Sequence, residues 1–164
     1  MRKILIIISM FTLGFSFQTG TKTIGGSTSI LFDFNDDSKT YSFNPSGGVF
    51  ISNNVLIEGG FYYHNHKHGD SDPYDYSYNY YTFTAGARYF LNNTYAGFAY
   101  QSNPKHSEYD YEYNREKMHI KIGMLSPIAT NIYLNYNFDY NWYLNDDEDD
   151  GIMTINCGIS YFWN

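Results

Sequence analysis

The chain has 164 residues and a formal net charge of −7, and 21% of its residues are aromatic, including 19 Tyr. This length suggests one domain, and the acidic balance argues against a nucleic-acid partner, which would need a basic surface. The aromatic share is about twice that of an ordinary globular domain, so the fold must use these rings. A single cysteine, Cys157, excludes an intramolecular disulfide.

The first 17 residues predict a secretory signal peptide. A basic start, Arg2 and Lys3, precedes an apolar run that is too short to cross a membrane as a helix. Gly14 and Ser16 provide small residues for cleavage near Ser16 or just beyond it. We therefore expect a signal peptide over residues 1–17 and one exported domain over residues 18–164, which carries 8 basic and 17 acidic residues and a net charge of −9.

The rest of the chain contains eight segments in which apolar and polar residues alternate. Such a period of two predicts strands with one apolar and one polar face. In the second segment Pro45 falls on the apolar side and predicts a locally weak or bulged strand. In chain order the segments cover about residues 24–34, 40–51, 55–66, 78–91, 94–101, 115–125, 132–142 and 152–164.

The seventh segment, residues 132–142, shows the pattern most clearly. Its polar face consists of Tyr133, Asn135, Asn137, Asp139 and Asn141. A strand resting on a soluble core does not need such an amide-rich face. About ten alternating residues, with aromatic side chains toward both ends of the apolar face, are typical of a strand that crosses an outer membrane between lipid and lumen.

The connections between these strands alternate in length. Residues 52–54, 92–93 and 126–131 are rich in Asn or contain Pro, hold no acid, and predict tight turns. The other connections are polar and mostly longer, and they carry thirteen of the seventeen acidic residues. Short turns at one rim and long loops at the other, with an even number of strands, are typical of outer-membrane barrels.

A soluble barrel or sandwich would also alternate, so the distribution of charge has to decide. Here one face holds aliphatic and aromatic side chains without charge, and charges of both signs gather on the other. We therefore predict an all-β fold, an eight-stranded antiparallel transmembrane up-and-down β-barrel. The charged set predicted to face the lumen is Asp33, Glu58, Arg88, Lys117, His119, Lys121 and Asp139.

The interior of such a barrel is about filled by its side chains. Tyr62, Tyr133 and Phe162 are predicted to point inward and narrow it further, so we do not expect a general porin. The lumen is expected to contain a structural ion-pair network of four residues. In it Glu58 or Asp139 pairs with Arg88 or Lys121.

Several short patterns resemble the small porin-family, OmpX/OmpA-like outer-membrane β-barrels of Gram-negative bacteria. They are Gly25-Gly26 at the first strand, the sequence Asn-Pro-Ser-Gly-Gly at residues 44–48, the turn at residues 52–54, and the aromatic end at residues 161–164. Members of such families often end in Phe, whereas here Asn164 follows Trp163. The resemblance covers essentially the whole mature chain.

The resemblance implies an integral outer-membrane protein with a structural or cell-surface interaction role. Its long loops would be extracellular and both termini periplasmic. We expect outer-membrane lipid, lipopolysaccharide and the barrel assembly machinery as partners, with a possible extracellular ligand on the Tyr-rich acidic loops. We expect no cofactor, no nucleic acid and a monomer.

Two segments suggest metal ligands. His64, His66 and His68 share one face if the third strand continues, and imidazoles of this kind bind zinc or copper. Same-face side chains on a strand lie about 6.6 Å apart, so one ion would need a bend or a further ligand such as His106, and a polar strand extension is the preferred interpretation. The acidic run at residues 146–150 lacks the full calcium-loop pattern and predicts a solvated charge cluster.

Two other functions remain as alternatives. A barrel enzyme acting on lipid acyl chains would need Ser, His and an acid at the rim, but His119 is predicted to face the lumen, and Ser107 is merely adjacent to His106. We therefore expect no catalysis. A surface adhesin would use the Tyr-rich segments 74–81 and 109–113 as contact area or offer an edge strand to a partner, unless these rings form the interfacial girdle.

Overall fold

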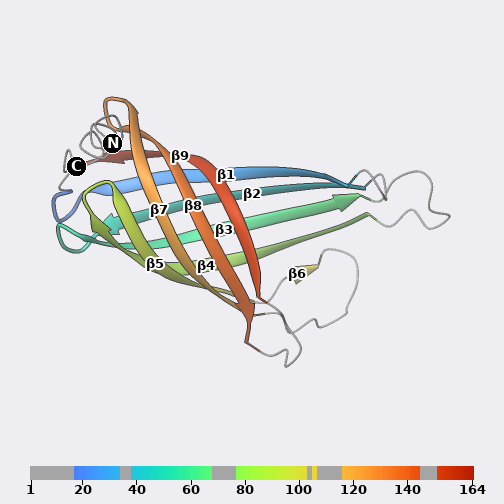
Figure 1. Ribbon diagram of the computed structural model, residues 1–164. Helices are drawn as coiled ribbons and strands as arrows, with labels where there is room; N and C mark the ends of the chain where they lie inside the picture. The colour runs from blue at the N-terminus through green and yellow to red at the C-terminus, as the bar shows by residue number, and fades with distance from the viewer. Residues whose placement is uncertain (1–16, 34–37, 68–76, 103–104, 107–115, 145–150) are drawn as a thin grey trace, which may run out of the picture.

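The chain forms a closed antiparallel β-barrel (Figure 1). The computed structural model describes residues 17–33, 38–67, 77–102, 105–106, 116–144 and 151–164. Within these residues there are nine strands, and all except β6 form the ring. The pairing of β3 with β4 closes this ring. The strands are β1 (Lys22–Asp33), β2 (Ser38–Phe50), β3 (Val55–Lys67), β4 (Ser77–Leu91), β5 (Thr94–Gln101), β6 (Lys105–His106), β7 (Lys117–Ala129), β8 (Ile132–Tyr143) and β9 (Ile152–Trp163). The predicted eight-stranded antiparallel barrel is thus confirmed.

Four strands continue beyond the ring as a projecting sheet. β1 pairs with β9 only up to Ser27 and Gly158, and β4 pairs with β5 only from Thr84 toward the short turn. Past these points β1 to β4 remain paired with one another, and in Figure 1 they extend well beyond the other strands. We call this part, residues 28–33, 38–44, 61–67 and 77–83, the projecting sheet.

The structure corrects two boundaries. The polar connection expected between the segments at 94–101 and 115–125 contains the two-residue strand β6, which pairs with Tyr80 and Tyr81 of β4. The turn expected at residues 126–131 is shorter, because β7 continues to Ala129 with a shift of register between Pro127 and Ala129. Pro has no N–H for a regular ladder and is tolerated in a strand at such an irregularity.

Pro45 weakens its strand without bulging it. It lies opposite Gly26 of β1, but the ladder from β2 to β3 omits Asn44 and Pro45. Pairing resumes at Ser46 and Gly60 in the register that Phe43 and Tyr63 set. The missing N–H of Pro45 thus interrupts the ladder locally without inserting an extra residue.

Asn residues build two of the short turns as expected. Asn92 and Asn131 have φ angles of 57° and 62°, in the left-handed region. Asn tolerates this conformation better than most residues with a Cβ atom. Each turn therefore reverses the chain within two residues, between β4 and β5 and between β7 and β8.

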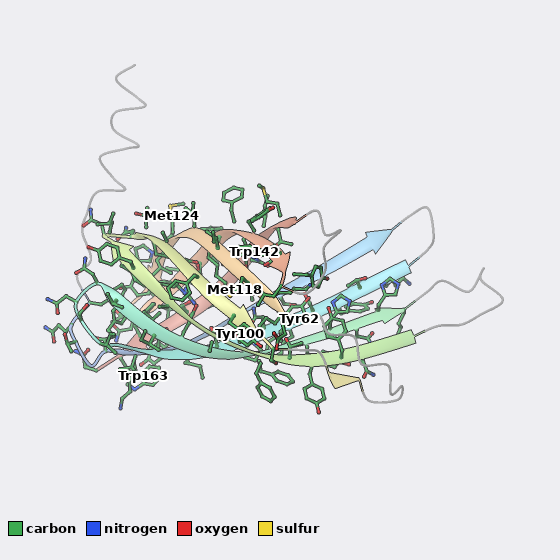
Figure 2. The ribbon with its side chains drawn as sticks, turned by 90° about the horizontal axis from the view of Figure 1, so that it is seen from below. Tyr62, Tyr100, Met118, Met124, Trp142 and Trp163 are labelled. Atoms are coloured by element: carbon green, nitrogen blue, oxygen red, sulfur yellow. The ribbon has the colours of Figure 1, made fainter. Side chains whose placement is uncertain are left out.

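The apolar side chains lie on the outside of the barrel. Ile155 and Met153 are 74% and 71% exposed, and Ile122, Phe98 and Phe138 are also largely exposed. Figure 2 shows Trp163 near the end with the short turns and Trp142 toward the opposite end of the ring. Because Glu58, Asp139 and other polar residues are buried inside, the faces are those of a transmembrane-type barrel and the reverse of a soluble one. No helix among the described residues has the length and apolarity to span a membrane.

Candidate functional site in the barrel interior

An aromatic plug fills the end of the barrel with the short turns. Phe17 stacks on Phe50 and Phe162 with ring centroids 4.5 and 4.6 Å apart, and Tyr133 meets Phe162 edge-on at 5.1 Å. Such pairs add to the stability that apolar burial provides. The plug consists of the buried residues Phe17, Phe50, Leu56, Phe90, Tyr95, Leu125, Tyr133 and Phe162. It closes this end of the lumen.

The sequence contained a signal for the plug that the alternation analysis did not use. Phe50, Leu56, Phe90 and Leu125 are large apolar residues that fall on the polar, inward phase of their strands. Each lies within a few residues of a short turn. Apolar residues out of phase with the lipid-facing set, confined to one rim, therefore indicate a plug.

A buried ion pair lies next to the plug. Arg88 of β4 donates from Nε to Glu58 Oε1 of β3 at 2.8 Å, and its second nitrogen donates to Glu58 Oε2. The guanidinium also lies over the Tyr95 ring, with Cζ 4.9 Å from the centroid. A two-pronged contact of this kind fixes both side chains, and the ring contact adds a cation–π attraction.

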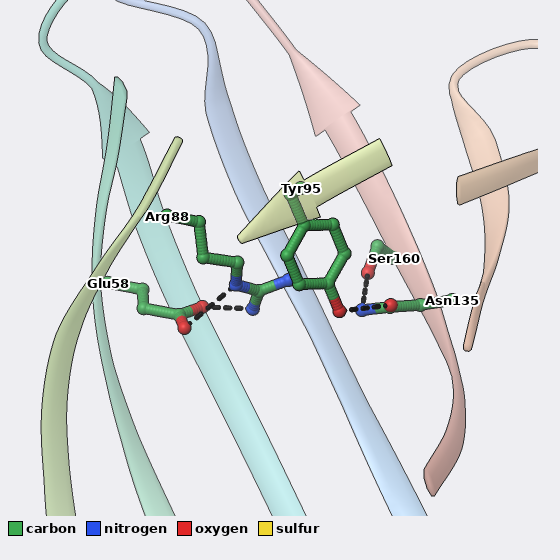
Figure 3. A network of polar contacts seen from close by, with 5 residues as sticks. All are labelled: Glu58, Arg88, Tyr95, Asn135 and Ser160. Carbon is green, nitrogen blue, oxygen red and sulfur yellow. Dashed lines mark hydrogen bonds and ion pairs between the residues drawn. The ribbon is translucent and has the colours of Figure 1, made fainter. Parts of the chain in front are cut away.

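Tyr95 extends this contact across the lumen, as Figure 3 shows. Its hydroxyl donates to Asn135 Oδ1 of β8 at 2.7 Å, and Asn135 Nδ2 donates to Ser160 Oγ of β9 at 3.5 Å. Gly123 makes room for the ring, since a Cβ there would lie 2.5 Å from Tyr95 Cζ. The chain of contacts thus connects β3 and β4 to β8 and β9 through the interior.

The other two residues of the expected network are placed differently. Lys121 lines the same polar cavity as Glu58 and Arg88. Asp139 lies opposite Lys121 in the β7–β8 register, but among the described residues its ion-pair contact is with His119, at 3.4 Å between Oδ1 and Nδ1. The four residues therefore share one lumen. Within the described residues, Glu58 and Arg88 are the two members of this set that pair with each other.

The inner face of the projecting sheet carries His64 and His66 at the open end of the lumen. His64 stacks on Tyr80 with centroids 4.7 Å apart, and its Nδ1 lies 3.2 Å from the Tyr62 hydroxyl. His66 Nδ1 shares a hydrogen bond with Thr40 Oγ1 at 2.8 Å. Burial, and secondarily the positive charges of His66 and Lys117, lower the pKa of His64 to about 4.

Comparison with solved structures finds the same architecture. Ail of Yersinia pestis, also solved with the heparin analogue sucrose octasulfate, matches with a TM-score of 0.53 and 16% identity over 89% of this chain and 100% of that chain. The N-terminal barrel of Pseudomonas aeruginosa OprF matches at 0.51, with 14% identity over 89% and 98%. A designed transmembrane β-barrel matches at 0.51, with 14% identity over 91% and 100%. The chain has the fold of the small outer-membrane β-barrels. No protein-family profile and no curated protein matches it.

Several predicted features of this outer-membrane barrel fold lie outside the described residues. They include His68, Ser107 and the acidic run at 146–150. His64 and His66 do share a face of β3, as the alternation predicts, but each has its own neighbours. Among the described residues no group of three His, Cys, Asp or Glu side chains is arranged to hold a metal ion.

Proposed function

We propose that this chain is an integral outer-membrane β-barrel protein with a structural or cell-surface interaction role. The observation that carries the proposal is the combination of a closed ring, an apolar exterior and a blocked, polar interior. Lipid is the solvent that suits such an exterior, because the exposed side chains are apolar and the closed ring leaves no open sheet edge in the membrane.

The interior supports a role other than bulk transport or catalysis. The plug closes one end of the lumen, and the polar cavity around Glu58 and Arg88 has a volume of about 40 Å³. A water molecule needs about 10–15 Å³ of such space, so a cavity of this size holds a few waters. We propose neither a general porin nor an enzyme.

The asymmetry of the two ends supports an orientation in the membrane. The described chain ends and the short turns gather at the plugged end, and the projecting sheet extends from the other (Figure 1). We place the plugged end in the periplasm and the projecting sheet with the acidic connections outside the cell. The barrel assembly machinery would insert the chain, and lipopolysaccharide would surround its outer rim.

The projecting sheet is the part best suited to a partner. Beyond Ser27 and Gly158, β1 and β9 are no longer paired, so within the described part of the chain residues 28–33 form a sheet edge that a strand of another protein can join. The long connections expected outside the membrane hold thirteen acidic residues, and this charge favours a partner with a basic surface.

Electrophoresis of membrane fractions tests the proposal. A closed barrel resists detergent until heated, so unboiled protein should migrate faster than boiled protein and should be recovered with the outer membrane. An epitope inserted at residues 107–115 should be accessible to antibody on intact cells, whereas one added after Asn164 should require permeabilised cells. Recovery in the soluble fraction, or identical mobility before and after boiling, would contradict the barrel assignment, and the opposite labelling would reverse the orientation.

A second experiment tests the interaction role separately. Replacing residues 69–75 and 108–114 with short Gly-Ser turns should leave heat-dependent mobility unchanged while adhesion of cells to basic protein surfaces falls. A barrel variant that folds and adheres as before would remove the interaction role and leave the structural one.

A further inference from the structure

His119 and Asp139 form a second polar centre in the lumen. They come from neighbouring strands, β7 and β8, and are 9% and 7% exposed. His119 Nδ1 and Asp139 Oδ1 lie 3.4 Å apart. Among the described residues, however, three of their atoms have no hydrogen-bond partner, namely both ring nitrogens of His119 and Oδ1 of Asp139. The two groups are close together but are not oriented toward one another as a donor and an acceptor.

Asn141 is the third residue here with an unsatisfied polar atom. It lies directly opposite His119 in the β7–β8 register and two residues from Asp139 on the same face of β8. Its Oδ1 is also buried without a hydrogen-bond partner in the described part of the chain. A buried polar group without a hydrogen-bond partner destabilises the folded state, so three such residues at one place point to a ligand that satisfies them together.

Lys121 does not neutralise Asp139. It faces Asp139 across the β7–β8 pair, but within the described residues no Lys121–Asp139 ion pair forms within 4.0 Å. Lys121 instead lines the cavity around Glu58 and Arg88. Among the described residues, Asp139 therefore has no lysine or arginine within ion-pair distance, and a metal cation can take that place beside the imidazole.

The geometry points to a transition-metal site. Two ligands of one tetrahedral zinc ion, each about 2.0–2.1 Å from the metal, lie about 3.3–3.4 Å from each other. The observed separation of His119 Nδ1 and Asp139 Oδ1 is 3.4 Å. An imidazole nitrogen favours zinc, copper or nickel over calcium or magnesium. We propose that His119, Asp139 and Asn141 bind one zinc-type dication, with water completing the coordination.

The environment sets the expected strength. Lys117 and Lys121 flank His119 on the inner face of β7 and repel a dication, and one ligand is a neutral amide. We therefore expect weaker binding than at a structural zinc site, with one ion per chain.

Titration of the purified, untagged barrel in detergent with ZnCl₂ tests the proposal, with Co²⁺ absorption as a second readout. One ion should bind per chain, and His119→Gln and Asp139→Asn should each weaken binding at least about tenfold, the effect typical of disturbing a metal ligand or its support. The control is the double variant His64→Gln/His66→Gln, which removes two imidazoles at the open end and should bind as the wild type does.

Asn141→Asp provides a gain of function. Replacing the amide oxygen with a carboxylate supplies charge at the same position, so zinc should bind about tenfold tighter in this variant, by the same measure of ligand effects. Heat-dependent mobility checks that each variant folds. Unchanged zinc affinity in His119→Gln, Asp139→Asn and Asn141→Asp, or loss of binding in the His64/His66 control instead, would overturn the proposal.

Discussion

Arg88 and Glu58 meet inside the barrel although they are not direct partners in the sheet. Arg88 lies opposite Leu56 and Glu58 opposite Gly86 in the β3–β4 register, so the two side chains reach each other diagonally. Gly97 of β5 leaves space for this approach, because a Cβ there would lie 2.9 Å from Arg88 Cγ. The pair is buried on all sides by the barrel wall.

Removing one partner should therefore destabilise the barrel more than removing both. Arg88→Met leaves the Glu58 carboxylate buried without its cation, which costs about 3–5 kcal/mol, whereas a well-packed apolar pair of similar volume often costs little. We expect Glu58→Met/Arg88→Met to recover most of the stability lost in Arg88→Met. Urea unfolding in lipid vesicles, followed by the mobility of unboiled protein, measures this. Equal losses in the single and double variants would contradict it.

The plug should control conductance. Phe50→Ala/Phe162→Ala removes two of the rings that stack on Phe17, and each Phe→Ala change in a core costs about 3–5 kcal/mol. Planar-bilayer recordings should show little steady current for the wild type and measurable current for the double variant. Phe98→Ala, a change of the same size on the lipid face, is the control. A wild type that conducts freely would show that the plug is not a barrier.

The ring was predictable because alternation is a property of each strand alone. In β8 and β9 every second residue faces the lipid, so the alternation of apolar and polar residues can be seen directly in the sequence. The projecting sheet was not predictable in the same way. It exists because β1 continues past its last contact with β9, and the length of pairing between two distant strands is not encoded in either one.

The sequence alone could not predict which charged residues in the lumen form ion pairs. Lys121 and Asp139 are direct neighbours across β7 and β8 and still do not pair within the described residues, while Glu58 and Arg88 pair diagonally. Alternation assigns all four side chains to the lumen. Which charges meet depends on register and on the space that residues such as Gly97 leave.

The packing of Phe17 leads us to predict where the expected signal peptide is cleaved. Its ring packs at the centre of the plug, 4.5 Å from Phe50 and 4.6 Å from Phe162 between centroids. Cleavage after Ser16 would keep this residue, with small residues at the first and third positions before the cut, Ser16 and Gly14. We expect a mature N-terminus at Phe17, one residue before the boundary expected from the sequence. Intact mass or N-terminal sequencing of the membrane protein checks it, and a chain starting at Gln18 would contradict it.

His64 should make the projecting sheet sensitive to acid. Its pKa is lowered to about 4, chiefly by burial and further by His66 and Lys117, whereas an unfolded histidine has a pKa of about 6.5. As the pH falls below about 6.5, His64 binds a proton in the unfolded projecting sheet but not in the folded one. The stability of the folded sheet is therefore lost progressively down to about pH 4.

The contribution of His64 is full above about pH 6.5, where its neutral ring stacks on Tyr80. Protection of residues 61–67 and 77–83 from proteolysis should therefore decrease between pH 7.5 and 4.5, and His64→Phe should reduce this dependence while keeping an aromatic ring beside Tyr80. An NMR titration of the His64 ring in micelles measures its pKa directly. A midpoint near 6.5 would show that the ring is open to water, and the acid sensitivity would then need another cause.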